Sequence, residues 1–564
     1  MESTLFGRQY ETMEFSFPGA EPCGSQVEID LAGEFACGGE IRRVKGFYAG
    51  GGVYKLRFLP EQAGTYTYRI EGAALAAPVE GSFEAAPAAE GEHGIVRPDG
   101  IHLRFADGRH FFSFGTTVYA LAHQSDALIE ETLDTLSKAP FNKIRICVFP
   151  KHYRYNSNNP AHYAFLPKAG VPLQDFDASK SPAFPQKKET RDAYWDVHHP
   201  DFAFWDAFEK RLMQLKALGI QVDLILFHPY DRWGFSNLRQ EDNLVYLDYL
   251  LRRLAAYPHL WWSLSNEYDL SMNKTVADWE GIECFVAAND PYHHLLGNHN
   301  CFQYWDPARE NITHVSWQTR LLFRVVEMQR RYGKPVLIDE CRYEGNVPEF
   351  WGNLSGQDMT RAFWKVTVQG GYCTHGETFL PGTEMGARAT RTGEEDVVWW
   401  AKGGLLNGES IARIAFLRGI CEELPGPLTS FGSESGGASG NPFEGMCYKL
   451  GLSDEEYDAQ AQQAPEFARG FLTTVGVMRQ RERDFFFSSE FEYGGHCGED
   501  AFLYYKDDQC CASAELNLPE GKRYRVEVID TWDMTRTVAA EGVSGHIEVK
   551  LPGKPYMAIL CVKE

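Results

Sequence analysis

The sequence contains no long apolar run. No stretch of the 564 residues approaches the roughly 18–20 uncharged apolar residues of a membrane-spanning helix. The first residues, MESTLFGRQYETMEFSF, lack the basic start and the apolar centre of a secretory signal peptide. We therefore expect a protein that is neither held in a membrane nor exported through such a leader.

Basic residues are few compared with acidic ones. The chain has 55 Lys and Arg against 78 Asp and Glu, which gives a formal net charge of −23. Nucleic-acid backbones and anionic membranes repel such a surface. The charge balance therefore argues against both as main partners.

Disulfide and metal patterns are also missing. The 13 cysteines include no CxxC pair and no regular spacing, and Cys510 and Cys511 are neighbours, a poor geometry for a disulfide. In a chain of this length they are typical of reduced thiols, so we expect a cytoplasmic protein. No HExxH motif or Cys/His quartet indicates a zinc hydrolase, although scattered histidines and acids could bind a metal without a motif.

Nucleotide and serine-hydrolase motifs are absent too. No GxGxxG fingerprint or Walker A loop occurs, so we expect no cofactor. The segment GESIA at 408–412 imitates a nucleophile elbow, but it has Ala for the final Gly and no strand directly before it. We interpret Glu409 and Ser410 as the start of a helix.

The two ends of the chain carry strand patterns. In residues 1–90, the apolar residues of GVYKLRF alternate with basic ones, the period of a strand with one buried face. An Ala/Pro/Glu/Gly stretch at 85–94 is typical of a linker. Residues 426–564 open with a Gly/Ser-rich loop and end in short alternating runs. We predict a β-sandwich at each end.

The middle of the chain, residues 95–425, alternates between strand and helix patterns. We expect eight strands, beginning near residues 111, 141, 220, 261, 294, 312, 336 and 370. Amphipathic helices lie between them, such as 204–218 before Gly219 and 320–333 ending at Gly333. This pattern predicts a (β/α)₈ TIM barrel rather than a doubly wound open sheet. The long insertion at 152–200 should build or cover the site.

Two carboxylates end predicted strands. Glu267 closes WWSLSNE and Glu340 closes VLIDE, and in this fold both ends face the barrel mouth. Two acids in one cleft suit glycoside hydrolysis. A separation of about 5–5.5 Å favours retention of configuration, and roughly 6.5–9.5 Å favours inversion.

Residue alternation supports this choice of acids. In strand 263–267 the small polar residues share the parity of Glu267, and the bulky ones take the other, which would aim Glu267 inward. In the later strand, Ile338 and Glu340 share one parity and Asp339 takes the opposite one. We therefore rank Glu340 above Asp339.

Arg145 is predicted to be buried, because it lies inside the apolar strand KIRICVF. A buried guanidinium needs an anionic partner, and Glu340 is the natural one. The pairing would keep Glu340 ionised as a nucleophile while Glu267 keeps a raised pKa as the acid. A structural ion pair with another acid is the alternative.

Polar and aromatic residues close most of the other predicted strands. Hydroxyl recognition needs such donors and acceptors, and aromatic rings suit the C–H faces of sugars. Besides Arg145, the candidate substrate-binding residues are His228, Asn266, His299, Trp317, His375 and Glu377. Taken singly, each could equally be a structural residue.

These motifs resemble a known group of enzymes. WSLSNE and VLIDE resemble the acid/base and nucleophile motifs of clan A retaining glycoside hydrolases, and the barrel is similar to the DUF4038-type, apiosidase-like branch. The ends resemble the DUF5060 and DUF5605 domains. The resemblance implies Glu267 as acid/base, Glu340 as nucleophile and Asn266 as a contact to the sugar 2-hydroxyl.

The sequence departs from that group in one strand and leaves the substrate open. His375-Gly-Glu377 stands where many clan members carry a Trp, and some apiosidase-like relatives use Asp as the acid. We expect a retaining, exo-acting glycosidase without a metal, acting on small glycosides or imported oligosaccharides. A non-catalytic sugar-binding or scaffold protein and an inverting or lytic enzyme are the alternatives, and a homo-oligomer is left open.

Overall fold

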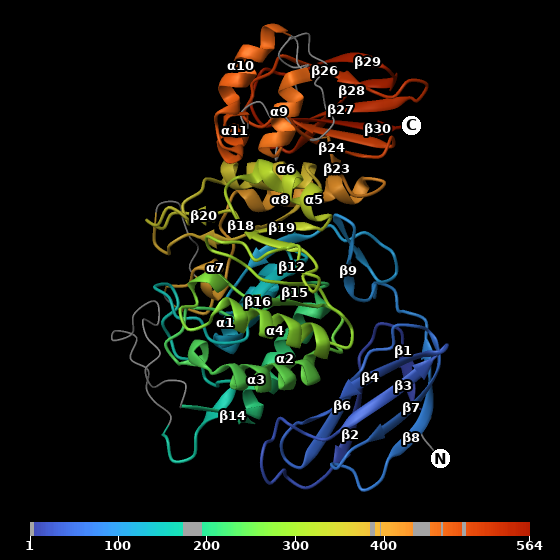
Figure 1. Cartoon of the computed structure of the whole chain (residues 1–564), viewed down its shortest axis with the longest axis vertical. Helices are drawn as coiled ribbons and strands as arrows, with labels where there is room; N and C mark the ends of the chain where they lie inside the picture. The colour runs from blue at the N-terminus through green and yellow to red at the C-terminus, as the bar shows by residue number, and fades with distance from the viewer. Residues whose placement is uncertain are drawn as a thin grey trace.

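The chain forms a central barrel between two strand-rich ends. Its computed structural model describes residues 5–172, 194–383, 390–394, 396–431, 452–463, 466–487 and 492–564. In Figure 1 the N-terminal sheets are blue, the barrel runs from cyan through green to yellow, and the C-terminal sheets are red. No helix of these residues is long and apolar enough to span a membrane.

The N-terminal region contains two sheets that pack face to face. One has the order β1 (Phe6–Arg8), β8 (Val79–Ala86), β7 (Gly64–Glu71), β3 (Ala32–Cys37), β4 (Glu40–Lys45), and the other β2 (Met13–Pro18), β6 (Val53–Phe58), β5 (Phe47–Tyr48). Phe35 of β3 stacks on Phe58 of β6 with ring centroids 3.9 Å apart. This is the contact between layers that a β-sandwich requires.

Alternation in β6 predicts only part of its burial. Tyr54, Leu56 and Phe58 are buried as expected. Arg57, on the other face, is buried as well, because that face packs against the barrel and its guanidinium forms an ion pair with Glu209.

All eight predicted barrel strands form, and every neighbouring pair is parallel. In chain order they are β11 (Phe114–Thr117), β12 (Lys143–Cys147), β15 (Gln221–Phe227), β16 (Leu260–Ser265), β17 (Leu296–Gly297), β18 (Val315–Gln318), β19 (Val336–Glu340) and β21 (Tyr372–His375). β17 and β18 are the two edges of this sheet, and a backbone hydrogen bond of 2.9 Å links Thr313, just before β18, to Leu296 of β17. The sheet is a TIM barrel.

Helices surround the barrel. They are α1 (Asp126–Leu136), α2 (Phe202–Ala217), α3 (Gln240–Leu254), α4 (Val276–Asn289), α5 (Val325–Tyr332), α6 (Gly356–Val368), the short α7 (Trp399–Lys402) and α8 (Ser410–Glu423). As predicted, left-handed glycines follow α2 and α5, Gly219 at φ 72° and Gly333 at φ 60°. Residues 298–314, all described, form no helix, so the expected alternation fails between β17 and β18.

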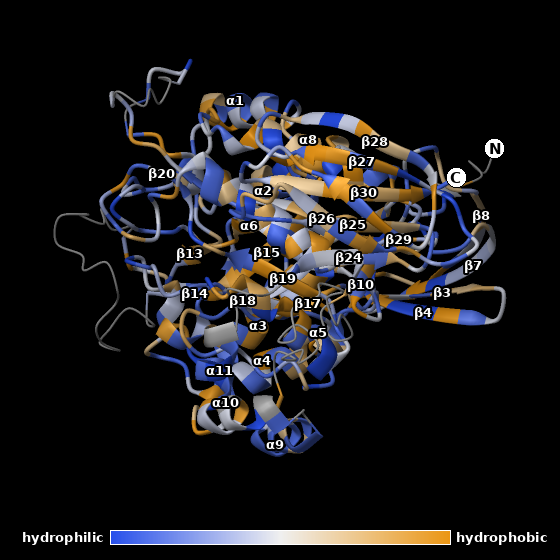
Figure 2. Ribbon diagram, turned by 90° about the horizontal axis from the view of Figure 1, so that it is seen from above, coloured by the Kyte–Doolittle hydropathy of each residue, from blue (hydrophilic) through white to orange (hydrophobic). Residues whose placement is uncertain are grey.

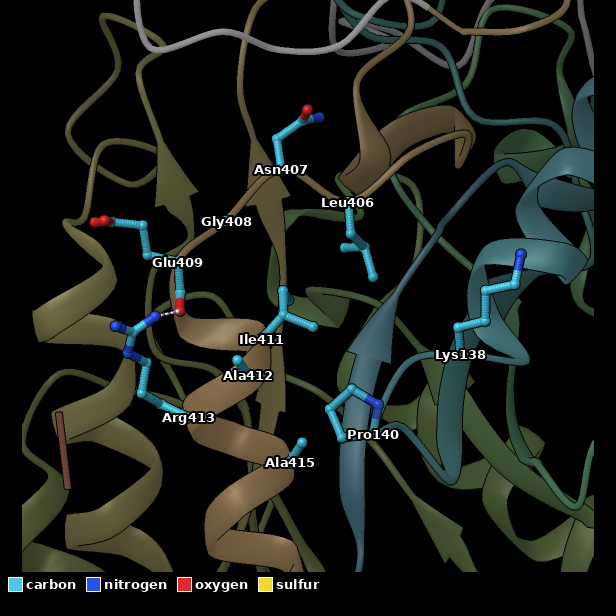
Figure 3. Close-up of a pocket in the computed structure, with 10 residues that line it drawn as sticks. All are labelled: Lys138, Pro140, Leu406, Asn407, Gly408, Glu409, Ile411, Ala412, Arg413 and Ala415. Carbon is cyan, nitrogen blue, oxygen red and sulfur yellow. Dashed lines mark hydrogen bonds between the residues drawn. The ribbon is translucent and has the colours of Figure 1, made fainter. Parts of the chain in front are cut away.

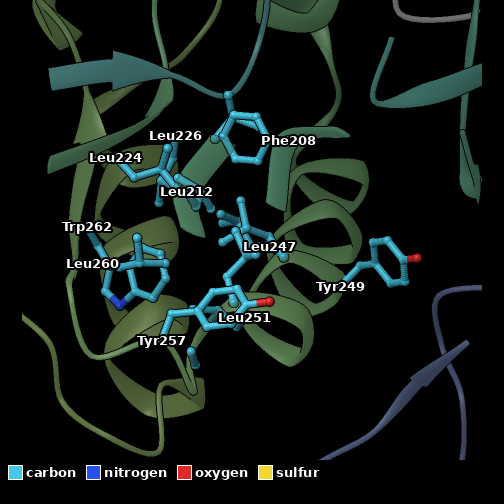
Figure 4. Close-up of a cluster of buried hydrophobic side chains, with 14 of the residues drawn as sticks. Phe208, Leu212, Leu224, Leu226, Leu247, Tyr249, Leu251, Tyr257, Leu260 and Trp262 are labelled. Carbon is cyan, nitrogen blue, oxygen red and sulfur yellow. The ribbon is translucent and has the colours of Figure 1, made fainter. Parts of the chain in front are cut away.

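The predicted apolar faces build the core between strands and helices. Figure 4 shows Phe208 and Leu212 of α2 beside Leu224 and Leu226 of β15, with residues of α3 next to them. At the N-terminal end of the barrel, the hairpin of β9 (Val96–Asp99) and β10 (His102–Phe105) packs on interior apolar residues. That end is closed, so a ligand must enter at the C-terminal end of the strands.

The insertion after β12 forms its own hairpin. β13 (Phe165–Pro167) pairs antiparallel with β14 (Trp195–Pro200), and residues 173–193 of the predicted insertion lie outside the described residues. The elbow-like segment at 408–412 is a helix start, as predicted, because α8 begins at Ser410.

The C-terminal region holds a six-stranded and a two-stranded sheet. The six-stranded sheet has the order β23 (Thr429–Ser430), β24 (Tyr493–Cys497), β25 (Ala501–Tyr505), β30 (Met557–Lys563), β27 (Tyr524–Asp530) and β28 (Thr535–Val543). The two-stranded sheet pairs β26 (Ser513–Asn517) with β29 (His546–Lys550). Three helices that the sequence analysis did not predict precede most of them, α9 (Asp454–Gln463), α10 (Glu466–Gly476) and α11 (Gln480–Phe487). α9 is mostly hydrophilic in Figure 2, so it offered little apolar periodicity to detect. Nearly all of the Gly/Ser-rich loop lies outside the described residues.

Candidate active site

Glu267 and Glu340 lie together at the open end of the barrel. Glu340 is the last residue of β19, and Glu267 follows β16 by two residues. In the amide orientation that satisfies its neighbours, the side-chain nitrogen of Gln318 lies 3.1 Å from Oε1 of Glu267 and 3.3 Å from Oε2 of Glu340. Both glutamates are buried. One donor therefore joins the two carboxylates in a shared pocket.

Glu267 is held by three neighbours. The Tyr230 hydroxyl donates to its carboxylate, and the Asn266 amide donates to the same oxygen at 3.2 Å. Its backbone is left-handed, at φ 48°, and its N–H donates to Nδ1 of His299 at 3.3 Å. Burial, and then the charge of Glu340, raise the pKa of Glu267 to about 7. This carboxyl can therefore hold a proton near neutral pH.

Glu340 has different neighbours. The Tyr119 hydroxyl donates to its Oε1 and also lies 3.0 Å from Oδ1 of Asn266. Arg145 Nη1 lies 3.9 Å from the same Glu340 oxygen, and Arg145 Nε lies 3.2 Å from Asp223. The two alternatives for Arg145 therefore occur together. Its guanidinium lies close to Glu340, and it also pairs with the structural acid Asp223.

A layer of buried charges lies directly below the pocket. The Lys143 ammonium is 3.1 Å from Asp223 and also pairs with Asp339. Burial opposes the charge of Arg145, but the acids around it, first of all Asp339, hold its pKa above the ordinary value. This ion network fixes the floor of the pocket.

The alternation argument for β19 predicted that Glu340 faces inward and Asp339 outward, and this prediction is wrong. Asp339, not Glu340, faces the barrel interior, where it accepts hydrogen bonds from Ser316 at 2.5 Å and Thr374 at 3.1 Å. Ile338 packs in the outer apolar layer. Glu340 reaches the pocket because the strand ends there and the β18–β19 register shifts between Trp317 and Gln318.

Of the other predicted site residues, Asn266 and His299 contact Glu267, as described, and His228 does not. The His228 ring is buried at the end of β15, with Nε2 3.1 Å from the Phe149 carbonyl oxygen. Burial, followed by the charge of Lys151, lowers its pKa to about 3. His228 is therefore a neutral residue that supports the pocket wall.

Three predicted binding residues lie outside the pocket. Trp317 packs in the outer apolar layer, and His375 stacks on Phe141 with centroids 5.0 Å apart. The Glu377 carboxylate accepts the backbone N–H groups of residues 407 and 408. Among the described residues, no hydrogen bond or ion pair joins these three to either glutamate, so their positions correct the expectation of substrate contact. The parity of β18 turns Trp317 outward, and that of β21 turns His375 outward.

Glu377 instead holds the backbone just before α8 through these two hydrogen bonds. A hollow of about 380 Å³ lies beside the start of that helix, lined by Lys138, Pro140 and residues 406–409, 411–413 and 415 (Figure 3). None of its lining residues contacts Glu267 or Glu340, so it is separate from the pocket.

Sequence reasoning missed several residues of the pocket. These are Tyr119, Lys151, Tyr230, Tyr343 and Trp400. Tyr119 and Tyr230 follow β11 and β15 directly, so their place at strand ends was a usable signal. Trp400 lies on α7, far along the chain, and no local pattern indicates that it reaches the pocket.

Trp400 supplies the aromatic wall that strand β21 lacks. Its ring centroid lies 5.1 Å from Trp351, 5.7 Å from Tyr119 and 5.7 Å from Tyr153. The absence of a Trp in His375-Gly-Glu377 therefore does not leave the pocket without an indole. In the described residues no group of three His, Cys, Asp or Glu is placed to hold a metal ion.

Comparisons with known proteins agree with this architecture. Residues 97–379 match the family described as apiosidase-like, catalytic domain, while residues 7–73 and 490–561 match the domains of unknown function DUF5060 and DUF5605. No curated protein matches the sequence.

Solved structures show the same fold. A protein of Bacteroides vulgatus ATCC 8482, described as a candidate glycoside hydrolase, is 31% identical over 99% of both chains with a TM-score of 0.79. A family 5 glycoside hydrolase from the same organism is 14% identical over 84% of this chain and 93% of its own length, with a TM-score of 0.56, which is a likeness of fold alone. The chain belongs to the apiosidase-like catalytic-domain family of glycoside hydrolases.

Proposed function

We propose that the protein is a retaining glycoside hydrolase with Glu340 as nucleophile and Glu267 as acid/base. The Gln318 contact carries this proposal. Because one nitrogen lies 3.1 Å and 3.3 Å from an oxygen of each glutamate, those oxygens cannot be farther apart than the sum of the two distances. This upper limit for the two contacted oxygens supports a closely spaced pair, as in retaining enzymes, against the wider pairs of roughly 6.5–9.5 Å in inverting ones.

The neighbours of the two acids support the division of roles. Glu267, with a pKa of about 7, can hold the proton that a leaving glycosidic oxygen needs. The Arg145 guanidinium and the Tyr119 hydroxyl face the Glu340 carboxylate, which in this proposal attacks the anomeric carbon. Water would next release the sugar, with Glu267 acting as base.

We propose that the enzyme acts from a chain end on small glycosides or oligosaccharides in the cytoplasm. The buried position of both glutamates supports exo action, because such a pocket admits a terminal sugar more easily than the middle of a polymer. The twelve described cysteines are all free, which fits a reducing compartment. Asn266, which contacts both Glu267 and Tyr119, would face the sugar 2-hydroxyl.

The test is a panel of nitrophenyl and alkyl glycosides with wild type, Glu340→Gln and Glu267→Gln. Glu340→Gln should lose roughly a thousandfold or more in kcat/KM on every substrate. Glu267→Gln should lose much less on nitrophenyl than on alkyl glycosides, because nitrophenolate leaves without protonation. Glu283→Gln is the matched control, since Glu283 is buried in α4 and bonds to Trp305.

Proton NMR of the first-formed anomer tests the stereochemistry. Retention supports the proposal, and inversion would show that water attacks directly. Full activity of Glu340→Gln would show that Glu340 is not the nucleophile. Sugar binding without turnover of any glycoside would instead indicate a binding protein.

A further inference from the structure

Lys151 places a buried ammonium group beside the catalytic pocket. The side chain follows β12 and is only 3% exposed. Among the described residues, no hydrogen bond or ion pair involves its Nζ. A buried ammonium without a partner is costly, so its position requires an explanation.

Three aromatic rings surround this ammonium. Nζ lies 3.5 Å from the ring centroid of Tyr119, 4.4 Å from that of Tyr230 and 4.7 Å from that of Trp400. Ring faces attract a cation but accept no ordinary hydrogen bond, so the three ammonium hydrogens keep their bonding capacity. The rings therefore hold the charge and leave it available to a ligand.

The same rings place the ammonium beside the reaction centre. The hydroxyl of Tyr119 contacts Glu340, and the hydroxyl of Tyr230 contacts Glu267. Nζ thus lies one tyrosine ring away from each proposed catalytic group. A sugar bound between the two glutamates would lie next to it.

Two other buried cations of this region already have acids. Lys143 pairs with Asp223 and Asp339, and Arg145 lies against Asp223 and Glu340. Lys151 has none within ion-pair distance in the described part of the chain. Its charge also offsets the repulsion that the two glutamates would exert on an anionic ligand.

We propose that Lys151 binds the carboxylate of an acidic sugar, so that the substrate of this enzyme contains a uronic acid at the catalytic pocket. The proposal rests on the proposed function, because it takes the pocket between Glu267 and Glu340 as the substrate site. An ammonium–carboxylate contact in a buried, aromatic pocket is a charge-assisted hydrogen bond, stronger than a contact to a neutral hydroxyl.

Calorimetric titration of the full chain with matched sugars tests the proposal. D-galacturonate and D-glucuronate are compared with D-galactose and D-glucose, which carry a hydroxymethyl group instead of the carboxylate, and acetate reports simple carboxylate binding. We expect the uronates to bind wild type at least tenfold more tightly than their neutral partners, and acetate to bind far more weakly than either uronate. Lys151→Met, which preserves the length and the apolar stem, should lose this preference, and Lys151→Arg should keep most of it.

Lys138→Met is the control, because Lys138 is an exposed residue outside the pocket. Equal binding of uronates and neutral sugars by wild type, or an unchanged preference in Lys151→Met, would overturn the inference. Circular dichroism and thermal melting establish that each variant is folded.

The experiment is independent of turnover. If no glycoside is hydrolysed but uronate binding depends on Lys151, the proposed catalysis fails while this inference stands. If hydrolysis occurs with no preference for uronates, the inference fails while the catalysis stands.

Discussion

At the scale of residues, the two glutamates differ through their neighbours. Glu267 is crowded by buried groups and by the charge of Glu340, which favours its protonated form. Glu340 instead faces the Arg145 guanidinium and the Tyr119 hydroxyl. The same side chain can therefore act as an acid in one position and as a nucleophile in the other.

The pH dependence of the rate should follow the Glu267 carboxyl. With a pKa of about 7 the acid is protonated below that pH and loses its proton above it, so kcat/KM should fall as the pH rises through about 7. The measurement is a pH–rate profile on an alkyl glycoside, whose leaving group needs the proton. A rate that stays constant from pH 6 to 9 would contradict this assignment.

Tyr230 should influence the pH at which the rate falls. Its hydrogen bond favours the charged carboxylate and lowers the pKa of Glu267, so Tyr230→Phe should move the alkaline limb to higher pH. Tyr153→Phe, whose ring packs on Tyr230 at 5.5 Å, is the matched control and should leave the limb in place. A shift to lower pH in Tyr230→Phe would disprove the role.

At the scale of elements, short features decide where functional side chains point. The register shift between β18 and β19 brings Gln318 beside Glu340, and the left-handed backbone at Glu267 aims that residue at the same pocket. Helix ends follow simpler rules. Glycines in the left-handed region stop α2 and α5, so the next strand can begin at once.

Gly219 offers a test of the helix ends. Its φ is 72° and a Cβ there would meet nothing within 4 Å, so Gly219→Ala should cost about 1–2 kcal/mol from backbone strain alone. Gly419, inside α8, also has open space around a Cβ, and Gly419→Ala should stabilise by up to about 1 kcal/mol.

Denaturant unfolding followed by circular dichroism measures both changes. Opposite signs are expected from the same substitution, because only the backbone conformation differs. A destabilisation by Gly419→Ala as large as that by Gly219→Ala would contradict this account.

At the scale of the whole molecule, both ends are attached to the barrel through buried contacts. Glu209 of α2 lies 2.7 Å from Arg57 of the N-terminal sheet and 2.5 Å from Arg253 of α3. On the other side, Trp364 of α6 stacks on Tyr505 with centroids 5.3 Å apart. These contacts make the sheets part of the barrel's support.

Arg57→Ala tests the N-terminal attachment. The substitution removes one of the two arginines that pair with the buried Glu209 and leaves Arg253 as the other. We therefore expect a loss of about 2–4 kcal/mol in the free energy of unfolding. Arg43→Ala, which breaks an exposed ion pair with Glu34, should cost at most about 1 kcal/mol. Scanning calorimetry of both variants measures the difference, and equal effects would show that the buried network does not stabilise the attachment.

Local sequence patterns were enough to predict the eight barrel strands, the ends of α2 and α5, and the positions of Glu267 and Glu340 at strand ends. These follow from local rules, because periodicity and glycine position act on neighbouring residues. The resemblance to apiosidase-like enzymes was also readable there, since WSLSNE and VLIDE are contiguous.

Which side chains share the pocket depends instead on how the chain folds in three dimensions. Trp317 and His375 close their strands as expected, yet strand parity turns both into the outer layer. Lys151 and Trp400 come from nearly opposite ends of the barrel sequence. In the folded chain both pack against the ring of Tyr119. Such contacts depend on how the strands register and close around the barrel, which no local pattern encodes.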